Sequence, residues 1–94
     1  MESNILVNKL KAEGFSHVFE WVDGPNTEYP PHSHKGRVSF YIKEGCVTLN
    51  FGMGNGIMLC KGERCDVIPG KQHSAKVGPQ GCSWVVGEEI EGDA

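Results

Sequence analysis

Hydrophobic and polar residues alternate along residues 15–22 of this chain. Every second position there carries a ring, in the order Phe15, His17, Phe19 and Trp21. A period of two is typical of a β-strand, because successive side chains point to opposite faces. Residues 23–26, with the sequence DGPN, then break the pattern with residues that favour turns. The pattern predicts a strand over residues 15–22.

Short hydrophobic runs separated by turn residues continue to residue 86. They predict strands at residues 38–42, 46–51, 57–60, 65–68, 73–77 and 82–86, with a hairpin loop at 52–56. Pro30 and Pro31 lack N–H groups and cannot sit in a central ladder, so they mark the start of the segment that carries His32 and His34. Many short strands at steady spacing indicate an all-β sandwich or barrel, and a closed barrel leaves no exposed sheet edge.

The two ends of the chain have weaker patterns. In the N-terminal segment 1–14, residues 5–10 are apolar and then charged, which fits either a short helix that ends near Gly14 or an edge strand. Residues 88–94 are acidic and predict a solvated tail. A length of 94 residues predicts one domain over residues 1–94.

Composition and charge exclude several classes of protein. A net charge of −3 without a basic cluster argues against a nucleic-acid partner. No apolar run approaches the roughly 20 residues that a membrane helix needs, and the polar start of the chain is unlike a secretory signal. We therefore expect a cytoplasmic protein without a membrane partner. In that compartment the four cysteines, which form no C-x-x-C pair, are interpreted as reduced thiols: Cys46, Cys60, Cys65 and Cys82.

Three of the four histidines have a spacing that suits a metal ion. His32 and His34 are two residues apart, so on a strand they face the same way with Cα atoms roughly 6.5–7 Å apart. His73 opens a later strand, which could lie beside the first pair. Three neutral imidazoles suit zinc, iron, nickel or copper, and they leave coordination positions open. His17 lies in the aromatic row and is expected to be a core or rim residue.

The spacing alone also permits a plainer interpretation. An H-x-H pair occurs by chance, and two surface histidines beside two prolines need no ligand. His73, followed by Ser74 and Lys76, fits a strand histidine with a satisfied hydrogen bond. Both interpretations stay open at this point.

Two segments resemble the motifs of the cupin superfamily. His32-Ser33-His34 followed by Gly45 resembles the first motif, which is roughly G-x5-H-x-H-x3,4-E-x6-G. Residues 62–73, GERCDVIPGKQH, resemble the second motif, G-x5-P-x-G-x2-H-x3-N. The resemblance covers about residues 24–77. It implies a small antiparallel β-barrel of the jelly-roll type and a metal site at His32, His34 and His73.

The sequence departs from the family pattern at the acidic ligand. That position falls on Val38 or, with the longer spacing, on Ser39. The other departures are Asn26 for glycine, Ile68 for proline and Val77 for asparagine. The resemblance thus implies a three-histidine site without its glutamate, and Glu28, the hydroxyl of Ser39 or water are open as replacements.

A site of this kind has expected properties. The resemblance implies a divalent transition metal, with iron, zinc, nickel and manganese as candidates. Three neutral ligands leave the ion its full charge, so we expect weaker metal retention and attraction of anionic ligands. The pocket candidates are Tyr29, Arg37, Val38, Phe40 and Trp84. Arg37 is a candidate clamp for a carboxylate or phosphate, although alternation from an inward Val38 favours the surface.

Three classes of function follow from these features. The first is a metal-dependent enzyme on a small polar or anionic molecule, such as a dioxygenase or an isomerase. No acidic residue between the motifs lies close to the histidines as a general base, which favours oxidative or Lewis-acid chemistry. The second is a non-catalytic barrel that binds or senses a small molecule, with a degenerate or empty metal site. The third is a structural fold with a degenerate site. We also expect a homodimer, with Ile5, Leu6, Val7 or residues 15–21 at the interface.

Overall fold

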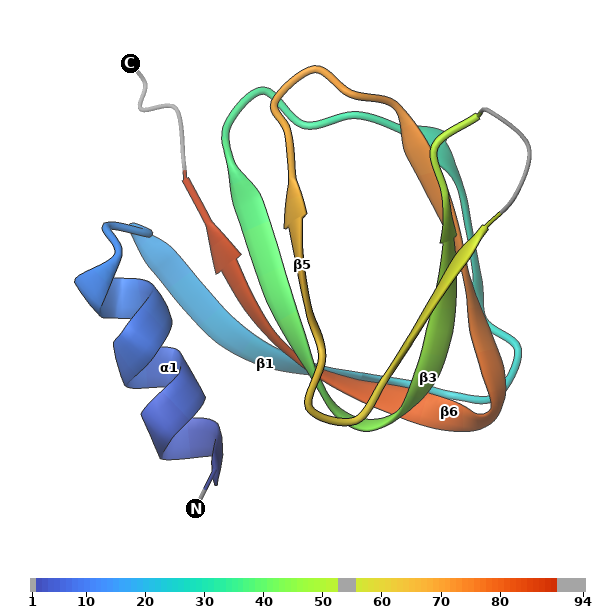
Figure 1. Cartoon of the computed structure of the whole chain (residues 1–94), viewed down its shortest axis with the longest axis horizontal. Helices are drawn as coiled ribbons and strands as arrows, with labels where there is room; N and C mark the ends of the chain where they lie inside the picture. The colour runs from blue at the N-terminus through green and yellow to red at the C-terminus, as the bar shows by residue number, and fades with distance from the viewer. Residues whose placement is uncertain (1, 53–55, 90–94) are drawn as a thin grey trace.

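One helix and a curved antiparallel sheet make up the part of the chain that the structure describes. The computed structural model describes residues 2–52 and 56–89, with side chains from residue 4 onward. The helix α1 (Glu2–Ala12) comes first (Figure 1). The strands within the described residues are β1 (His17–Asp23), β2 (Glu28–His32), β3 (Val38–Asn50), β4 (Ile57–Cys60), β5 (Arg64–Val67) and β6 (His73–Glu88).

The long strands β3 and β6 pair with each other along most of their length and form the spine of the sheet. The second part of β6 lies between β1 and the first part of β3, which also pairs with β5. The first part of β6 lies between β2 and the second part of β3, which also pairs with β4. The sheet therefore has two halves, β1-β6-β3-β5 and β2-β6-β3-β4, and Figure 1 shows them facing each other.

Two glycines allow β3 and β6 to bend from one half into the other. Gly45 and Gly81 have positive φ angles of 81° and 79°, which glycine adopts without strain. A Cβ atom on Gly45 would meet the carbonyl oxygen of Gly81 at 2.0 Å. The register of β3 also shifts on either side of this bend. Residues 38–42 and 46–51, predicted as separate strands, therefore form one strand, and so do residues 73–77 and 82–86.

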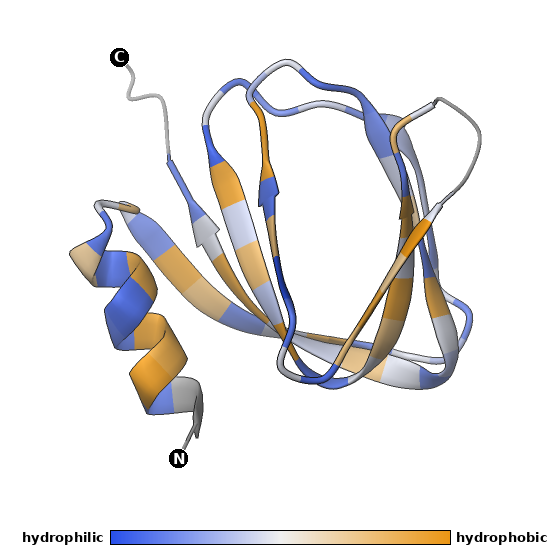
Figure 2. Ribbon diagram, viewed as in Figure 1, coloured by the Kyte–Doolittle hydropathy of each residue, from blue (hydrophilic) through white to orange (hydrophobic). Residues whose placement is uncertain are grey.

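Buried hydrophobic residues form one cluster between the two halves of the sheet and a second cluster on the outer face of one half. Figure 2 shows hydrophobic residues on α1 and along the strands. Along β3, Val38, Phe40 and Ile42 point into the inner core, and Tyr41 points to the other face. After the bend, Leu49 points inward again. This is the alternation that the sequence predicted, and it sorts neighbouring residues into two separate cores.

The N-terminal segment is a helix, which decides between the two alternatives left open by its sequence. Leu6, Val7 and Leu10 recur at helical spacing and pack on the outer face of β3 and β6 together with Phe15 and the pair Tyr41 and Val85. The helix ends before Gly14, whose φ of 97° suits a residue after a C-terminus. Leu6, Val7 and Phe15 are thus covered by their own chain, and the strand predicted from residue 15 begins at His17.

The interpretation of the four cysteines as reduced thiols is wrong for two of them. Cys46 and Cys60 are direct partners across β3 and β4, with Cα atoms 4.1 Å apart, and form a disulfide. This spacing is slightly shorter than the usual range of about 4.4–6.8 Å for disulfides. Cys65 and Cys82 are free thiols, and burial raises the pKa of Cys82 to about 12. The pairing depends on strand register, which spacing along the chain did not reveal.

The predicted acidic tail begins later than expected. Glu88 is the last residue of β6, and Glu89 contacts Arg37. Residues 90–94 lie outside the described residues, and so do residues 53–55 of the predicted hairpin loop. Among the residues described, no helix is long and apolar enough to span a membrane.

Candidate metal centre

Strand pairing brings the three predicted histidines together at one end of the sheet. His32 ends β2, and its Cα partner across the ladder is His73, the first residue of β6. His34 lies in the loop that follows β2. Pro30 and Pro31 are tolerated in β2 because, in the described residues, this strand pairs on one side only, with β6.

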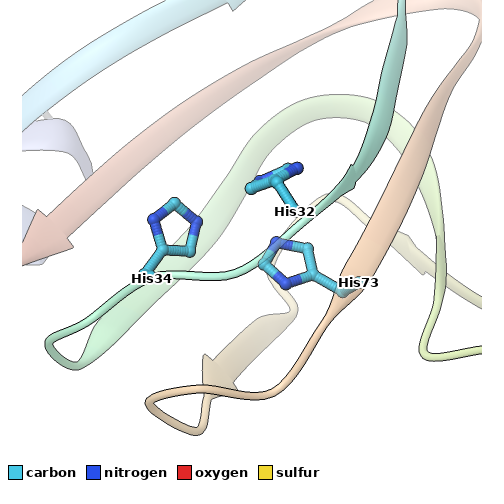
Figure 3. Close-up of side chains that lie close together, drawn as sticks. All are labelled: His32, His34 and His73. Atoms are coloured by element: carbon cyan, nitrogen blue, oxygen red, sulfur yellow. The ribbon is translucent and has the colours of Figure 1, made fainter.

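The three imidazole rings surround one small space (Figure 3). Ring centroids lie 4.3 Å apart for His32 and His73, 5.0 Å for His32 and His34, and 5.3 Å for His34 and His73. One nitrogen of each ring lies within 4.8 Å of the others. Imidazole nitrogen binds zinc at about 2.0–2.1 Å, so two ligands of one ion lie at most about 4.2 Å apart. Small ring rotations bring the three nitrogens to that spacing.

Backbone carbonyls orient two of the rings. The Nδ1 atom of His32 lies 2.7 Å from the carbonyl oxygen of Pro30. A carbonyl only accepts hydrogen bonds, so Nδ1 carries the proton and Nε2 keeps the lone pair that a metal requires. The Nδ1 atom of His73 faces the carbonyl oxygen of Lys71 at 3.5 Å, a longer version of the same arrangement. Such hydrogen bonds are typical of histidine ligands.

Burial favours the neutral, metal-binding form of two of the three histidines. Desolvation lowers the pKa of His34 and of His73, and the neighbouring His32 lowers both further. The carboxylate of Glu88 opposes this shift at His34, and the carbonyl of Lys71 opposes it at His73. The histidines therefore fit a divalent ion, since histidine binds a metal ion through its neutral ring.

The histidines lie at the edge of a cavity between the two halves of the sheet. Its volume is about 360 Å³, and its walls are mostly apolar. Four of the five predicted pocket residues line it: Tyr29, Val38, Phe40 and Trp84. Phe19 and Trp21 of β1 line it as well. Trp84 also belongs to the inner core, where its ring packs edge-on against Phe40 at 4.9 Å between ring centroids.

Arg37, the fifth predicted pocket residue, does not line this cavity. Its guanidinium lies over the ring of Phe15, 4.5 Å from the ring centre, and its backbone N–H and Nε groups donate to Glu89. Because Val38 points into the cavity, its neighbour Arg37 points to the outer face. The alternation of strand residues already favoured this outcome.

Solved structures with the same architecture include several cupins. An RmlC-like cupin from Shewanella frigidimarina is 22% identical, with a TM-score of 0.67, over 81% of this chain and 68% of its own. A double-stranded β-helix protein from Klebsiella pneumoniae is 26% identical, with a TM-score of 0.66, over 80% of this chain and 69% of its own. The chain has the cupin fold.

An enzyme is among the proteins with a similar cupin fold. The polyketide cyclase RemF from Streptomyces resistomycificus is 26% identical, with a TM-score of 0.67, over 85% of this chain and 60% of its own. No protein-family model and no curated protein matches the sequence. The predicted jelly-roll barrel of the cupin type is thus confirmed at the level of the fold.

The adjacent strand carries a carboxylate beside the position where the cupin motif usually has its glutamate. Val38, at the position of the usual glutamate, lines the cavity. Its Cα partner on β6 is Glu88, which also lines the cavity and acts electrostatically on His34. Sequence reasoning missed Glu88 because it was assigned to the tail. Continuing the inward alternation of Trp84 and Val86 by two residues would have found it.

The other proposed substitutes for the glutamate point elsewhere. The hydroxyl of Ser39 bonds to Asp66 and lies 3.0 Å from Arg64, on the outer face of the sheet. Glu28 is exposed and pairs with Lys76 at 3.8 Å. Neither residue lines the cavity.

A second missed residue is Asp23, the last residue of β1. Its carboxylate accepts hydrogen bonds from Trp21 Nε1 at 3.1 Å, from Tyr29 Oη at 2.7 Å and from Trp84 Nε1 at 3.0 Å. The sequence showed Asp23 only as part of a turn. No spacing along the chain indicated that Trp21, Tyr29 and the distant Trp84 share it.

Proposed function

We propose that this protein binds one divalent transition-metal ion through His32, His34 and His73 and presents it to a small polar or anionic ligand in the cavity. The observation that carries this proposal is the convergence of three imidazoles at the edge of an apolar cavity. Imidazole ligands suit iron, zinc and nickel, whereas manganese favours oxygen ligands, so we rank manganese last.

The protein's own groups prepare this site for a ligand. A divalent ion with three neutral ligands supplies Lewis-acid chemistry and attracts anions. The carbonyl of Pro30 holds the ring of His32 in the required tautomer. The walls of the cavity beside the site are mostly apolar. Glu88 provides a carboxylate close to His34.

Glu88 changes the balance between the possible reactions. The absence of a base between the two motifs favoured oxidative chemistry over proton transfer. A carboxylate at the cavity wall supplies the missing type of group, which favours an isomerase over a dioxygenase. The alternative is a non-catalytic barrel that binds or senses the same kind of molecule. A binder releases its ligand unchanged, whereas an enzyme turns it over.

Metal content tests the proposal directly. Protein without a polyhistidine tag is measured by plasma mass spectrometry beside His32→Ala/His34→Ala and beside the control His17→Ala, which removes a histidine outside the cluster. We expect near-stoichiometric metal in the first and third samples and none in the second. Empty samples throughout, with no binding of added Fe(II), Zn(II) or Ni(II), would refute the metal site.

Two further proposals concern the state of the protein in the cell. We propose a homodimer that uses exposed hydrophobic residues on α1 and β1, Ile5 and Val22. Sedimentation that shows a monomer at micromolar concentration would refute it. The cytoplasmic location stays a prediction, and the Cys46–Cys60 disulfide argues against it because disulfides persist in oxidising compartments.

A further inference from the structure

The cavity has two chemically different ends. β1 runs from His17, opposite Glu88, to Asp23, opposite Cys82 beside the bend. Those ends of the strand are about 20 Å apart at roughly 3.3 Å per residue. The histidine cluster and Glu88 lie at the first end, and the three aromatic donors to Asp23 gather toward the second. A ligand between them therefore meets a polar end and an aromatic end.

Asp23 engages the hydrogen-bond donors of the aromatic end. The indole N–H groups of Trp21 and Trp84 and the hydroxyl of Tyr29 all donate to this one carboxylate. Hydrogen bonding to one acceptor also restrains the rotation of the three side chains. The aromatic end therefore offers a ligand pre-oriented ring surfaces, with its hydrogen-bond donors already engaged.

The size and lining of the cavity suit a flat molecule. A 150 Å³ apolar cavity holds benzene, so the volume of about 360 Å³ accommodates roughly two fused rings. Aromatic side chains line it from both halves of the sheet, with Tyr29 on one side and Phe19, Phe40 and Trp84 on the other. Flat rings gain from offset or edge-on contact with such walls, which a globular molecule of equal volume does not.

The charge at the polar end depends on the metal. The ionisable groups there are the three histidines and Glu88, which lines the same cavity. A divalent cation held by the histidines would add positive charge at that end and would attract an oxyanion. The charge of the favoured ligand thus follows from the proposed function, on which this inference rests.

We propose that the ligand is a planar aromatic molecule of one or two rings, seated among the aromatic residues that Asp23 organises, with an oxyanion directed at the histidine cluster. Asp23 acts as a positioning residue, since it reaches the ligand through Trp21, Tyr29 and Trp84. Phe19 and Trp84 are the residues that contact the rings.

Three probes test this by isothermal titration calorimetry, with and without zinc. They are 2-naphthoate, adamantane-1-carboxylate, which carries the same charge on a globular body, and 2-naphthalenemethanol, which is flat and neutral. With zinc, we expect 2-naphthoate to bind at least tenfold more tightly than the adamantane acid. Removal of zinc weakens 2-naphthoate at least tenfold and changes the affinity of the alcohol less than threefold.

The results separate this inference from the proposed function. Equal affinity for the flat and globular acids would refute the placement of the rings among the aromatic residues. Equal affinity for 2-naphthoate with and without zinc would refute the placement of its carboxylate at the histidine cluster. If zinc does not bind, the proposed function fails, and so does the placement of the carboxylate at the histidine cluster. Binding of 2-naphthalenemethanol still tests the placement of the rings among the aromatic residues. If zinc binds and neither naphthalene probe does, this inference fails and the metal site stands.

Variants locate the ring within the cavity. Phe19→Leu, on a strand that pairs on one side only among the described residues, is expected to weaken 2-naphthoate about tenfold at unchanged zinc content. Tyr41→Phe, on the outer face, is the control and should change neither the affinity for 2-naphthoate nor the zinc content. Asp23→Asn keeps the shape of the side chain and should weaken 2-naphthoate about fivefold.

A spectroscopic readout distinguishes positioning by Asp23 from a purely structural role. Burial and the hydrogen bond to Asp23 raise the pKa of Tyr29. In a Tyr41→Phe background, Asp23→Asn should lower the ultraviolet titration midpoint of Tyr29. The same substitution should also lower the affinity for 2-naphthoate. An unchanged affinity for 2-naphthoate in Asp23→Asn would overturn the positioning role.

Discussion

The two faces of the sheet half β1-β6-β3-β5 are built from alternate residues of the same strands. One face is covered by the helix and carries ion pairs, and the other borders the cavity. On the outer face, Arg64 donates to Glu13 at 2.6 Å, to Asp66 at 3.0 Å and to Tyr41 at 2.9 Å, beside the packed helix α1. On the inner face, aromatic and aliphatic side chains border open space.

This difference separates stability from binding within one strand. The polar groups of the outer face are satisfied by one another, so that surface holds the helix and offers little to a ligand. The polar groups of the inner face gather at the two ends of the cavity, where the histidines and Asp23 lie. We therefore expect changes on the outer face to alter the free energy of unfolding, and changes on the inner face to alter binding.

The largest expected effect is in the outer core. Leu10 is fully buried between α1 and the sheet. Leu10→Ala should lower the free energy of unfolding by about 2–5 kcal/mol, because it removes buried methyl groups and leaves a cavity. Urea denaturation measures this loss, and metal content should stay at the wild-type level. A simultaneous loss of metal at full folding would show that the faces are not independent.

The disulfide tests the second half of the sheet. Cys46 and Cys60 are 14 residues apart, so their link stabilises the fold by about 3 kcal/mol through the entropy of the unfolded chain. Dithiothreitol should lower the urea midpoint of the wild type accordingly. The double variant Cys46→Ala/Cys60→Ala should start lower and not respond to the reductant. An equal response in both proteins would contradict the link.

Restoring the lost carboxylate sharpens the comparison on the inner face. Val38 lines the cavity at the position of the usual cupin glutamate. Val38→Glu should tighten zinc binding about tenfold, or ~1.4 kcal/mol, because it adds a charged ligand. Val38→Gln, which has the same shape without the charge, is the matched control. Competition with a zinc chelator measures both, and equal gains in the two variants would refute the electrostatic reason.

The smallest effect concerns acid stability of the outer face. The hydrogen bond from Arg64 lowers the pKa of Glu13 to about 2, from an ordinary value of 4.5. The folded state therefore binds this proton less readily, so the stabilisation is complete above pH 4.5 and is lost as the pH falls towards 2. Between these values the wild type should lose more stability than Glu13→Gln in urea titrations. Parallel losses would contradict the ion pair.

Local patterns predicted most strands and the histidine cluster. The period of two along residues 15–22 and the turn residues between runs are properties of neighbouring positions, so they are visible in sequence. His32 and His34 share a motif, His73 was a candidate from its place at the start of a later strand, and the resemblance to cupins joined the three in one site. The strand ends were less accurate, because β3 and β6 continue through bends that residues such as Gly45 and Gly81 permit only as a pair.

The errors share a cause in long-range pairing. Cys46 meets Cys60 only through the register of β3 and β4, and Glu88 meets the histidines only because β6 returns beside Val38. Asp23 gains its role from three aromatic residues of three different strands, of which Trp84 is 61 residues away. These long-range relations are not encoded in a short window of sequence.

The sequence by itself determined the alternation of inward and outward side chains, the histidine motif and the loss of the usual glutamate, since each depends on residue type and local spacing. Tertiary structure alone decided that residues 2–12 form a helix on the sheet, that two cysteines pair, that Glu88 lines the cavity beside Val38, and that three aromatic residues of the cavity wall share Asp23. The physical reason is that strand pairing and burial place distant residues side by side, and charge, hydrogen bonding and pKa all depend on those neighbours.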